Sequence, residues 1–592
     1  MVLQKDRKQR ILFIIEIITS IYWMTFLINT DSYYVVYLLI GVLGSFCWYQ
    51  NRKESILPPE GAKGVIGLVI AALISLAVVC ANYGLFETYF AATGRGFQYI
   101  YASISAVFVF VGGFFLLWNI LKYSAVYCQG YRLKHYEYSL KPAAVFGMAF
   151  VFTTSIYLII FFLFNYPGTI TPDSVHQLRE IMANEYSNHH PFYSTMLIKV
   201  FFDIGRKLFN DINGAVAVYS VFQAVFMAAG FAYLTVTLYQ MKVSAKVVMG
   251  TALIYTFLPY NIAYSTTMRK DALFAIFMLI LIVAFFRITE EIGCSMALNY
   301  GMLVLGGMGV CLFRNNGWPA FILCAVTFLL LFRGKHKKLV ITFIAVAIAS
   351  FIMKGPVLNM LQVSEPDILE SLAIPIQQIA RVITDGDDLT KEQEAILSQV
   401  VDIDRVEEAY LPYFVDPLKN LIREKNNVKL IKDHSKDFIK LYIELGLSHP
   451  VEYLKAWIDQ TRGYWNGGYN YWRWEHGVQE NSLGIFRTEG SYLFSRLMYE
   501  YLWIFQVIPM LYILLCIGFF VWLTMYLMYL AMIRGNKKVI VMAVPLLGNI
   551  ATLLAATPVF AEFRYAYSIF VCIPFLAFAL FYERGQNYLK EE

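Results

Sequence analysis

Apolar runs of about 20 residues recur along most of this chain, and they restrict its fold more than any other feature of the sequence. Hydrophobic residues make up 58% of the 592 positions, and charged residues only 15%. Backbone groups in lipid must be hydrogen bonded within the protein, so such runs form helices or a closed barrel. The runs are continuous and lack the alternation of barrel strands. The sequence therefore predicts an all-α polytopic membrane protein.

About fourteen transmembrane helices are predicted, and alternate loops between them are rich in Lys and Arg, for example "GKHKK" and "RGNKK". This positive-inside pattern predicts a multi-pass plasma-membrane protein with both termini in the cytoplasm. It also accounts for the net charge of +6, so the charge gives no reason to expect a nucleic-acid partner. The predicted spans cover residues 11–29, 33–50, 64–85, 98–121, 142–165, 213–238, 244–266, 270–288, 298–313, 318–332, 338–353, 503–533, 538–558 and 566–583.

Two polar segments fall on the predicted outer side. The first, 166–212, contains "TITPDSVHQLREIMANEYSNHHPFYST". Thr171 and Pro172 are suited to cap and start a helix, and a second amphipathic helix follows Pro191, so we expect two interfacial helices. The second segment has helical periodicity and predicts an extracytoplasmic helical domain. The chain is thus divided into a four-helix extension (1–141), a transmembrane core (142–353), the outer domain (354–502) and C-terminal transmembrane helices (503–592).

A few basic residues stand at predicted outer ends of spans, against the positive-inside trend. They are Arg269 and Lys270 beside Asp271, Arg314 beside Asn315, and Arg564 beside Tyr565. Ionisable groups at membrane depth are costly and often mark a substrate path. We therefore predict an anion-binding cavity, with phosphate as the natural guest because Arg forms forked hydrogen bonds to it. Snorkelling side chains or local ion pairs are the alternative explanation.

Two further features are candidates for binding. His189 and His190 precede Pro191, although they lack a recognised zinc-ligand spacing. The segment "GYWNGGYNYWRWEHG" offers aromatic faces for sugar rings and polar groups for hydroxyls, or it belongs to an interfacial aromatic belt. Its candidate substrate-binding residues are Trp472, Trp474, Glu475 and His476.

Together these motifs resemble the GT-C superfamily of membrane glycosyltransferases, which includes protein O-mannosyltransferases and the lipid A aminoarabinose transferase. The matching residues are Asp173 in "TPDS", His190–Pro191 in "NHHPF" and Arg564–Tyr565, with "KDALF" and "RNNG" similar to motifs of bacterial members. The resemblance covers roughly 142–583 and implies a GT-C-like core. The chain departs from the pattern because "HHPF" replaces a double proline and no second acid adjoins Asp173.

The resemblance implies transfer of a hexose or pentose from a polyprenyl-phosphate donor to an extracytoplasmic glycan, lipid or protein, with inversion at the anomeric carbon. Asp173 would be the catalytic base. Arg269, Lys270, Arg314 and Arg564 would bind the donor phosphate. His189, His190, Asp271, Asn315 and Tyr565 would contact substrates. No cofactor is indicated with certainty, and a divalent cation could assist.

Other functions also fit an outward-facing set of charges. A transporter or flippase of lipid-linked sugars would need cations and aromatics, but also repeats and polar groups near the midplane. A polymer transferase resembling O-antigen ligases would not require the acid in the first large loop. A non-catalytic sensor would explain the outer domain but not the aligned charges.

Overall fold

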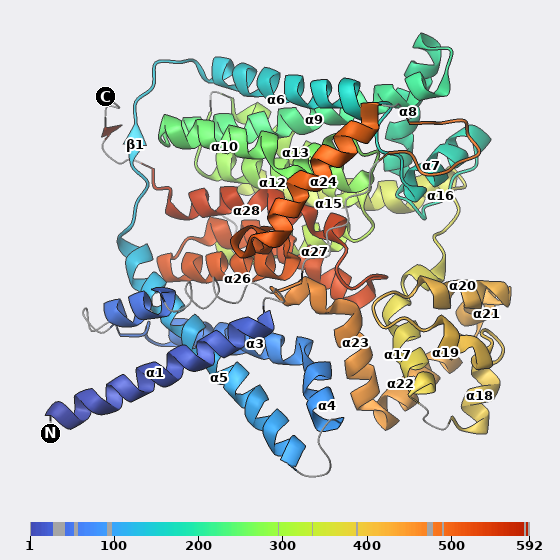
Figure 1. Ribbon diagram of the computed structural model, residues 1–592. Helices are drawn as coiled ribbons and strands as arrows, with labels where there is room; N and C mark the ends of the chain where they lie inside the picture. Colours follow the sequence, from blue (N-terminus) through green and yellow to red (C-terminus); the bar gives the residue numbers. More distant parts are fainter. Residues whose placement is uncertain are drawn as a thin grey trace.

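Within the part of the chain that the computed structural model describes, ten helices are long and apolar enough to cross a membrane (Figure 1). The described residues are 2–27, 42–51, 57–91, 97–293, 295–333, 336–385, 389–469, 477–487, 490–584 and 588–589. The ten helices are α3 (Ala62–Ala81), α5 (Phe97–Gly130), α6 (Pro142–Phe164), α9 (Ile212–Gln240), α12 (Lys270–Thr289), α13 (Met296–Phe313), α15 (Lys337–Ile352) with its continuation through η1 (Met353–Val357) and α16 (Leu358–Met360), α26 (Ile517–Arg534), α27 (Lys537–Ala556) and α28 (Phe563–Phe581). The protein is all-α and polytopic, as predicted.

The predicted number of fourteen spans is not confirmed. The bent pair α10 (Ala245–Phe257) and α11 (Pro259–Ser265), whose axes differ by 57°, has the form of a broken span or a re-entrant loop, and the number of spans rises to eleven if the pair is one span. The apolar part of α1 (Val2–Leu27) and α14 (Gly317–Phe332) are shorter apolar helices. The span predicted at 33–50 lies partly outside the described residues, which form a helix over 42–51.

One predicted boundary is wrong, because the run 503–533 is not a single helix. The chain forms α24 (Gly490–Val507), α25 (Pro509–Tyr512) and η4 (Ile513–Leu515) before α26 begins at Ile517. Pro509 has no N–H to give and its ring clashes with the preceding turn, which favours a helix end before it. Because apolar residues stand on both sides of this break, hydropathy does not reveal it.

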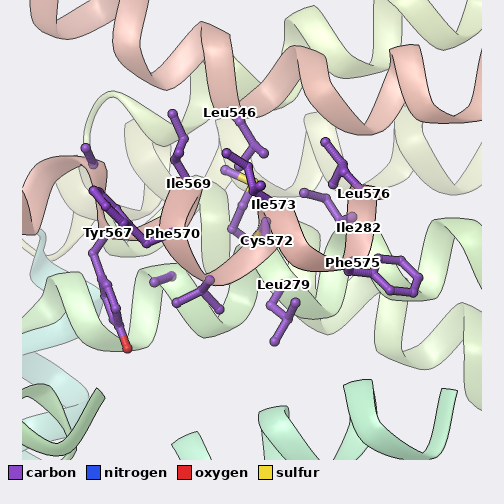
Figure 2. Packing of buried hydrophobic residues seen from close by; sticks show 14 of the residues in the cluster. Leu279, Ile282, Leu546, Tyr567, Ile569, Phe570, Cys572, Ile573, Phe575 and Leu576 are labelled. Atoms are coloured by element: carbon purple, nitrogen blue, oxygen red, sulfur yellow. The ribbon is translucent and has the colours of Figure 1, made fainter. Parts of the chain in front are cut away.

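The bundle is built around α12, of which 94% of the apolar window is buried. This helix packs against α9, α13 and α28. Leu279 and Ile282 of α12 lie beside Cys572, Phe575 and Leu576 of α28, with Leu546 of α27 close by (Figure 2). Because α12 begins at Lys270 and α28 begins one residue before Arg564, this packing fixes two of the predicted cations at the same end of the bundle.

The opposite end of the bundle gathers the basic loops. Its two short strands, β1 (His135–Tyr136) and β2 (Tyr588–Leu589), pair in parallel. Hydrogen bonds join loops and helix ends that are distant in the sequence, from Leu133 N to Phe581 O, Tyr136 N to Lys242 O and Lys537 Nζ to Leu331 O. The alternation of basic and non-basic loops therefore has a physical counterpart in the two ends of the bundle, while the compartment that each end faces stays a prediction.

A small helical domain is inserted between α16 and the later spans. Its hydrophobic core runs from Leu369 to Tyr453 and is separate from the core of the bundle. We call residues 367–453 the insert domain; it lies at the same end as α7 in Figure 1. Its elements are η2 (Ile368–Glu370), α17 (Ala373–Thr384), α18 (Lys391–Leu397), η3 (Ile403–Arg405), α19 (Val406–Ala409), α20 (Asp416–Glu424), α21 (Val428–Asp433), α22 (Ser435–Ser448) and the start of α23 (Pro450–Trp465).

The N-terminal extension packs as a group of its own. α1, α3 and α5 contact one another, and α26 connects α3 and α5 to the rest of the bundle. The short helix α4 (Tyr83–Ala91) reaches α23, where the Tyr83 hydroxyl donates to Asp459 Oδ2 at 2.5 Å. The division into four parts stays a prediction.

Candidate functional site

The first polar loop forms the two helices that were predicted, α7 (Pro172–Ala183) and α8 (Phe192–Leu208). The Thr171 side chain accepts from the Ser174 backbone N–H, and Ser174 Oγ accepts from that of Thr171, so the predicted cap at Thr171 is confirmed. On the apolar face of α7, Val175, Leu178 and Ile181 are buried. Met182 is exposed instead, because it lies at the edge of that face.

Asp173 is held in place from behind by the chain that precedes it. Residues 169–170 run extended between the segment before α12 and the segment after Gly477, with Met268 N donating to Thr169 O at 3.0 Å and Ile170 N to Gly477 O at 2.9 Å. Ser174 Oγ also donates to Met268 O at 2.6 Å. These bonds set the first turn of α7 directly beside the start of α12.

Lys270 and Arg269 differ in what they contact near Asp173. Lys270 Nζ is 3.6 Å from Asp173 Oδ2 and 3.0 Å from His190 Nδ1. Arg269 is buried, and its Nε donates to Thr171 Oγ1 at 3.4 Å. Arg269 therefore does not line the cavity described below and contacts the helix cap that carries Asp173.

Arg564, on the first turn of α28, forms the closest ion pair with Asp173. Its Nη1 lies 2.6 Å from Asp173 Oδ2, and its Nε lies 3.4 Å from Glu562 Oε1. The guanidinium also stands over the Tyr565 ring, 5.0 Å from the ring centroid. A single carboxylate thus faces cations from two different helices.

Arg314, which follows α13, is bound more firmly. Its Nη1 pairs with Asp271, whose side chain is only 2% exposed. Its guanidinium lies 4.6 Å from the Tyr565 centroid and 5.6 Å from that of Phe274. Arg314 is therefore fixed by a buried carboxylate and two aromatic rings, and Asp271 serves it from behind the cavity wall.

These side chains line one cavity of about 620 Å³ at the end of the bundle. Of the residues predicted as site residues, the cavity brings together eight and leaves Arg269 and Asp271 behind its wall. The eight lining residues are Asp173, His189, His190, Lys270, Arg314, Asn315, Arg564 and Tyr565.

The opposite wall comes from the insert domain and was not predicted. It contributes Asp367 and Glu370 near η2, and Asp416, Asn420 and Arg423 on α20. Arg423 Nη2 lies 2.8 Å from Asp367 and 3.0 Å from Glu370 carboxylate oxygens. The spacing i, i+4, i+7 on α20 is a polar helical stripe that the sequence contains, but nothing in the sequence says which cavity such a stripe faces.

The electrostatics of the cavity favour an ionised Asp173 and a neutral His190. Burial by itself raises the pKa of the Asp173 carboxyl, but the charges of Arg564 and Lys270 outweigh it and hold this pKa well below its usual range. Burial, with Lys270 beside it, lowers the pKa of His190 to about 2. Because Lys270 donates to Nδ1, the proton of the neutral ring is on Nε2.

Three histidines cluster at the cavity, with ring centroids of His176, His189 and His190 between 4.8 and 5.7 Å apart. His176 Nδ1 lies 3.9 Å from Glu180 Oε1. Among the described residues, no group of three or more His, Cys, Asp or Glu side chains has the arrangement of a metal site. The aromatic candidates Trp472, Trp474, Glu475 and His476 lie outside the described residues.

A protein-family model matches residues 176–592, well over half of the chain, and its description is a family of unknown function, DUF6020. The chain belongs to the DUF6020 family. The matched region contains the insert domain, Lys270, Arg314 and Arg564, whereas Asp173 lies just before it and the first spans are outside it. No curated protein and no solved structure matches the chain.

Proposed function

We propose that this DUF6020 protein is a membrane glycosyltransferase of the GT-C type. It moves a sugar from a polyprenyl-phosphate donor to a hydroxyl of a glycan, lipid or protein on the outer side of the membrane. The observation that carries the proposal is the contact of Asp173 with Arg564 and Lys270 in the wall of an open cavity at the end of the spans. Transfer of this kind needs a base and a set of cations close enough to act on the same bound sugar phosphate.

The cations suit the charge that develops in such a reaction. The donor is a phosphodiester with one negative charge, and the departing polyprenyl phosphate carries two. Lys270, Arg314 and Arg564 reach the cavity from three different helix ends, so the spans fix their positions before substrate binds. Preorganised charges that meet a developing negative charge often contribute more to catalysis than any other single effect.

Asp173 is proposed as the base that accepts the acceptor's proton. The acceptor oxygen forms a bond to the anomeric carbon as the bond from that carbon to the phosphate oxygen breaks, and the phosphate leaves with the electron pair. In the free protein Arg564 and Lys270 suppress the basicity of Asp173. A donor phosphate that takes up these two cations restores part of that basicity, so the base is strongest when the donor is bound.

The remaining residues are proposed to hold substrates. His190 offers its Nε2–H, while Asn315 and Tyr565 line the same cavity as the cations. Arg269 acts through Thr171 on the position of Asp173. The carboxylates of the insert domain suit hydroxyls of the acceptor or of the sugar.

A transporter is the main competing function, and one observation bears on it. The bent pair α10–α11 is an interrupted span of the kind that transporters use near the bilayer midplane. The residues of α11 are buried and none of them lines the polar cavity. The cavity instead lies at the ends of the spans, which favours transfer at the membrane surface.

Two variants test the proposal without leaving a fully buried charge unpaired. Arg564→Gln and Lys270→Met should each weaken binding of farnesyl phosphate about tenfold or more, since a charge-assisted hydrogen bond is worth about 1.5–3 kcal/mol. They should also slow release of polyprenyl phosphate from a sugar donor. Arg206→Gln, on the exposed end of α8, is the matched control. Unchanged binding and transfer in both variants would refute the phosphate site.

Arg314 requires a different substitution. Because Asp271 is buried against it, Arg314→Ala would leave an unpaired buried carboxylate at a cost of about 3–5 kcal/mol. Loss of activity in that variant would report misfolding. Arg314→Lys keeps the charge but loses the forked geometry, so it separates phosphate recognition from stability.

A further inference from the structure

The insert domain contains a second cavity, of about 350 Å³, with almost entirely apolar walls. Among its lining residues only Ser435 and Tyr442 carry polar side chains, and the Tyr442 hydroxyl donates to Gln378 Oε1 at 2.6 Å. Domain cores are close-packed and rarely leave voids larger than a water molecule. An apolar cavity of about 150 Å³ can hold a benzene ring, so in proportion this one takes roughly a dozen carbon atoms.

The cavity opens beside an apolar stripe on α22. Ile439 lines the cavity and is itself more than half exposed. Ile443 and Leu447 follow it at i+4 and i+8 and are exposed to a similar or greater extent. Leu441 and Leu445 of the same helix are buried in the domain core. α22 therefore has a second apolar face, directed away from its own domain.

The neighbouring helix α23 indicates what the exposed apolar face of α22 contacts. On α23, Tyr453 and Ala456 are buried on the side of α17, to which the helix packs. The other side of α23 carries Val451, Leu454 and Ile458, spaced i, i+3, i+7. α23 also packs against the spans α3, α26 and α27, where the Trp457 Nε1 donates to Leu554 O at 2.9 Å.

Ile458 is buried, whereas Val451 and Leu454 are more than half exposed. The start of α23 thus continues past the spans with the same apolar face. An apolar helix face that borders the spans and continues beyond them is expected to contact lipid. For α23 this lipid is the bilayer leaflet at the end of the bundle where the insert domain lies. α22 packs on α23 through Gly446 and Tyr453, which places its exposed stripe on the helix next to the one that borders the spans.

We infer that the insert domain binds one hydrocarbon chain of a membrane lipid in the cavity between α17, α20 and α22, and that the chain enters from the bilayer past Ile439. A fatty acyl chain and a polyprenyl chain share the required chemistry. α20 is the wall common to both cavities, since Leu418 and Ile422 line the apolar one and Asn420 and Arg423 the polar one. The inference stands on this packing and does not depend on the proposed transfer reaction.

The test uses the purified full chain in detergent with two photoactivatable probes, a diazirine analogue of palmitate and a diazirine analogue of farnesyl phosphate. Crosslinks mapped by mass spectrometry should fall on α17 and α22 for at least one probe, and the probe that labels them identifies the kind of chain. Ala380→Phe fills the cavity and should weaken this labelling about tenfold or more, since each buried methylene contributes a factor of roughly four. Ala395→Phe, on the exposed surface of α18, is the matched control.

A second pair of variants decides the question where thermal unfolding shows that Ala380→Phe is not folded. Ile439→Asp places a charge at the mouth, and Ile443→Asp places the same charge one turn away on the same exposed stripe. Labelling of α17 and α22 should fall about tenfold in Ile439→Asp and stay within about twofold in Ile443→Asp. The inference is overturned if neither probe labels α17 or α22. It is also overturned if Ile439→Asp leaves their labelling unchanged.

Discussion

Replacing Asp173 with Asn should slow sugar transfer and at the same time tighten binding of the donor phosphate. The substitution keeps the size of the side chain and its place in the first turn of α7. It removes the carboxylate that lies 2.6 Å from Arg564 and 3.6 Å from Lys270. The carboxylate that lies closest to both cations then no longer competes with the phosphate for them.

The size of the binding effect follows from the exposure of the pair. Two charges about 4 Å apart near a protein surface attract by roughly 4 kcal/mol before solvation is counted. Net values are about 0–1 kcal/mol for exposed pairs and about 3–5 kcal/mol when one partner of a buried pair is removed. The Asp173 side chain is 27% exposed, so we expect about 1–2 kcal/mol. Farnesyl phosphate should therefore bind about five- to thirtyfold more tightly to Asp173→Asn.

Turnover should fall by about 10²–10⁴, the usual contribution of a positioned general base. Farnesyl phosphate binding is measured by thermophoresis, and transfer by single-turnover release of polyprenyl phosphate from a sugar donor. Asp203→Asn makes the same chemical change on α8, where Asp203 pairs with Lys199 at the surface, and should alter neither quantity.

Two results would refute the reasoning. Retained turnover in folded Asp173→Asn would show that this carboxylate is not the base. Weaker phosphate binding together with a lower unfolding temperature would show that Asp173 is structural, because removing an aspartate that stabilises a helix start lowers the stability of the fold.

The remaining predictions concern topology, pH dependence and the insert domain. Ser364→Cys should react with a membrane-impermeant maleimide on intact cells and Lys134→Cys only after permeabilisation; the reverse pattern would place the cavity in the cytoplasm. Between about pH 5 and 8, kcat/KM should show no acid limb from the free protein, since Asp173 stays ionised and His190 stays neutral. The contribution of Asp173 to stability should be fully present above about pH 4 and decline as the pH falls toward its lowered pKa, as acid titration of the unfolding free energy against Asp173→Asn will show. Lys419→Met should destabilise the insert domain by about 1–2 kcal/mol in denaturant unfolding, because it breaks buried ion pairs whose carboxylates stay partly solvated; an unchanged midpoint would contradict this.

Local features were predictable from the sequence because neighbouring residues determine them. Thr171, Pro172 and Ser174 by themselves specify the start of α7, and Pro191 separates it from α8. Apolar runs likewise determine that the chain is an all-α membrane protein, since lipid leaves the backbone no other partner. Where apolar residues continue across a helix break, as around Pro509, the same argument gives a wrong boundary.

The cations Lys270, Arg314 and Arg564 stand out in the sequence because each breaks the distribution of charge along a membrane protein. Their partners do not stand out. Packing of α12 and α28 decides that Arg564 and Lys270 meet at Asp173, and that Arg269, one residue from Lys270, lies behind the wall.

The insert domain shows the limit most clearly. Its amphipathic helices follow from periodicity, but the polar stripe of α20 and the apolar stripe of α22 are each compatible with water, another protein, lipid or a substrate. Only the tertiary structure decides that the first faces the cavity of the spans and that the second surrounds the mouth of an apolar one. The sequence determines which faces need covering, because that depends on local spacing, and the packing of distant segments determines what covers them.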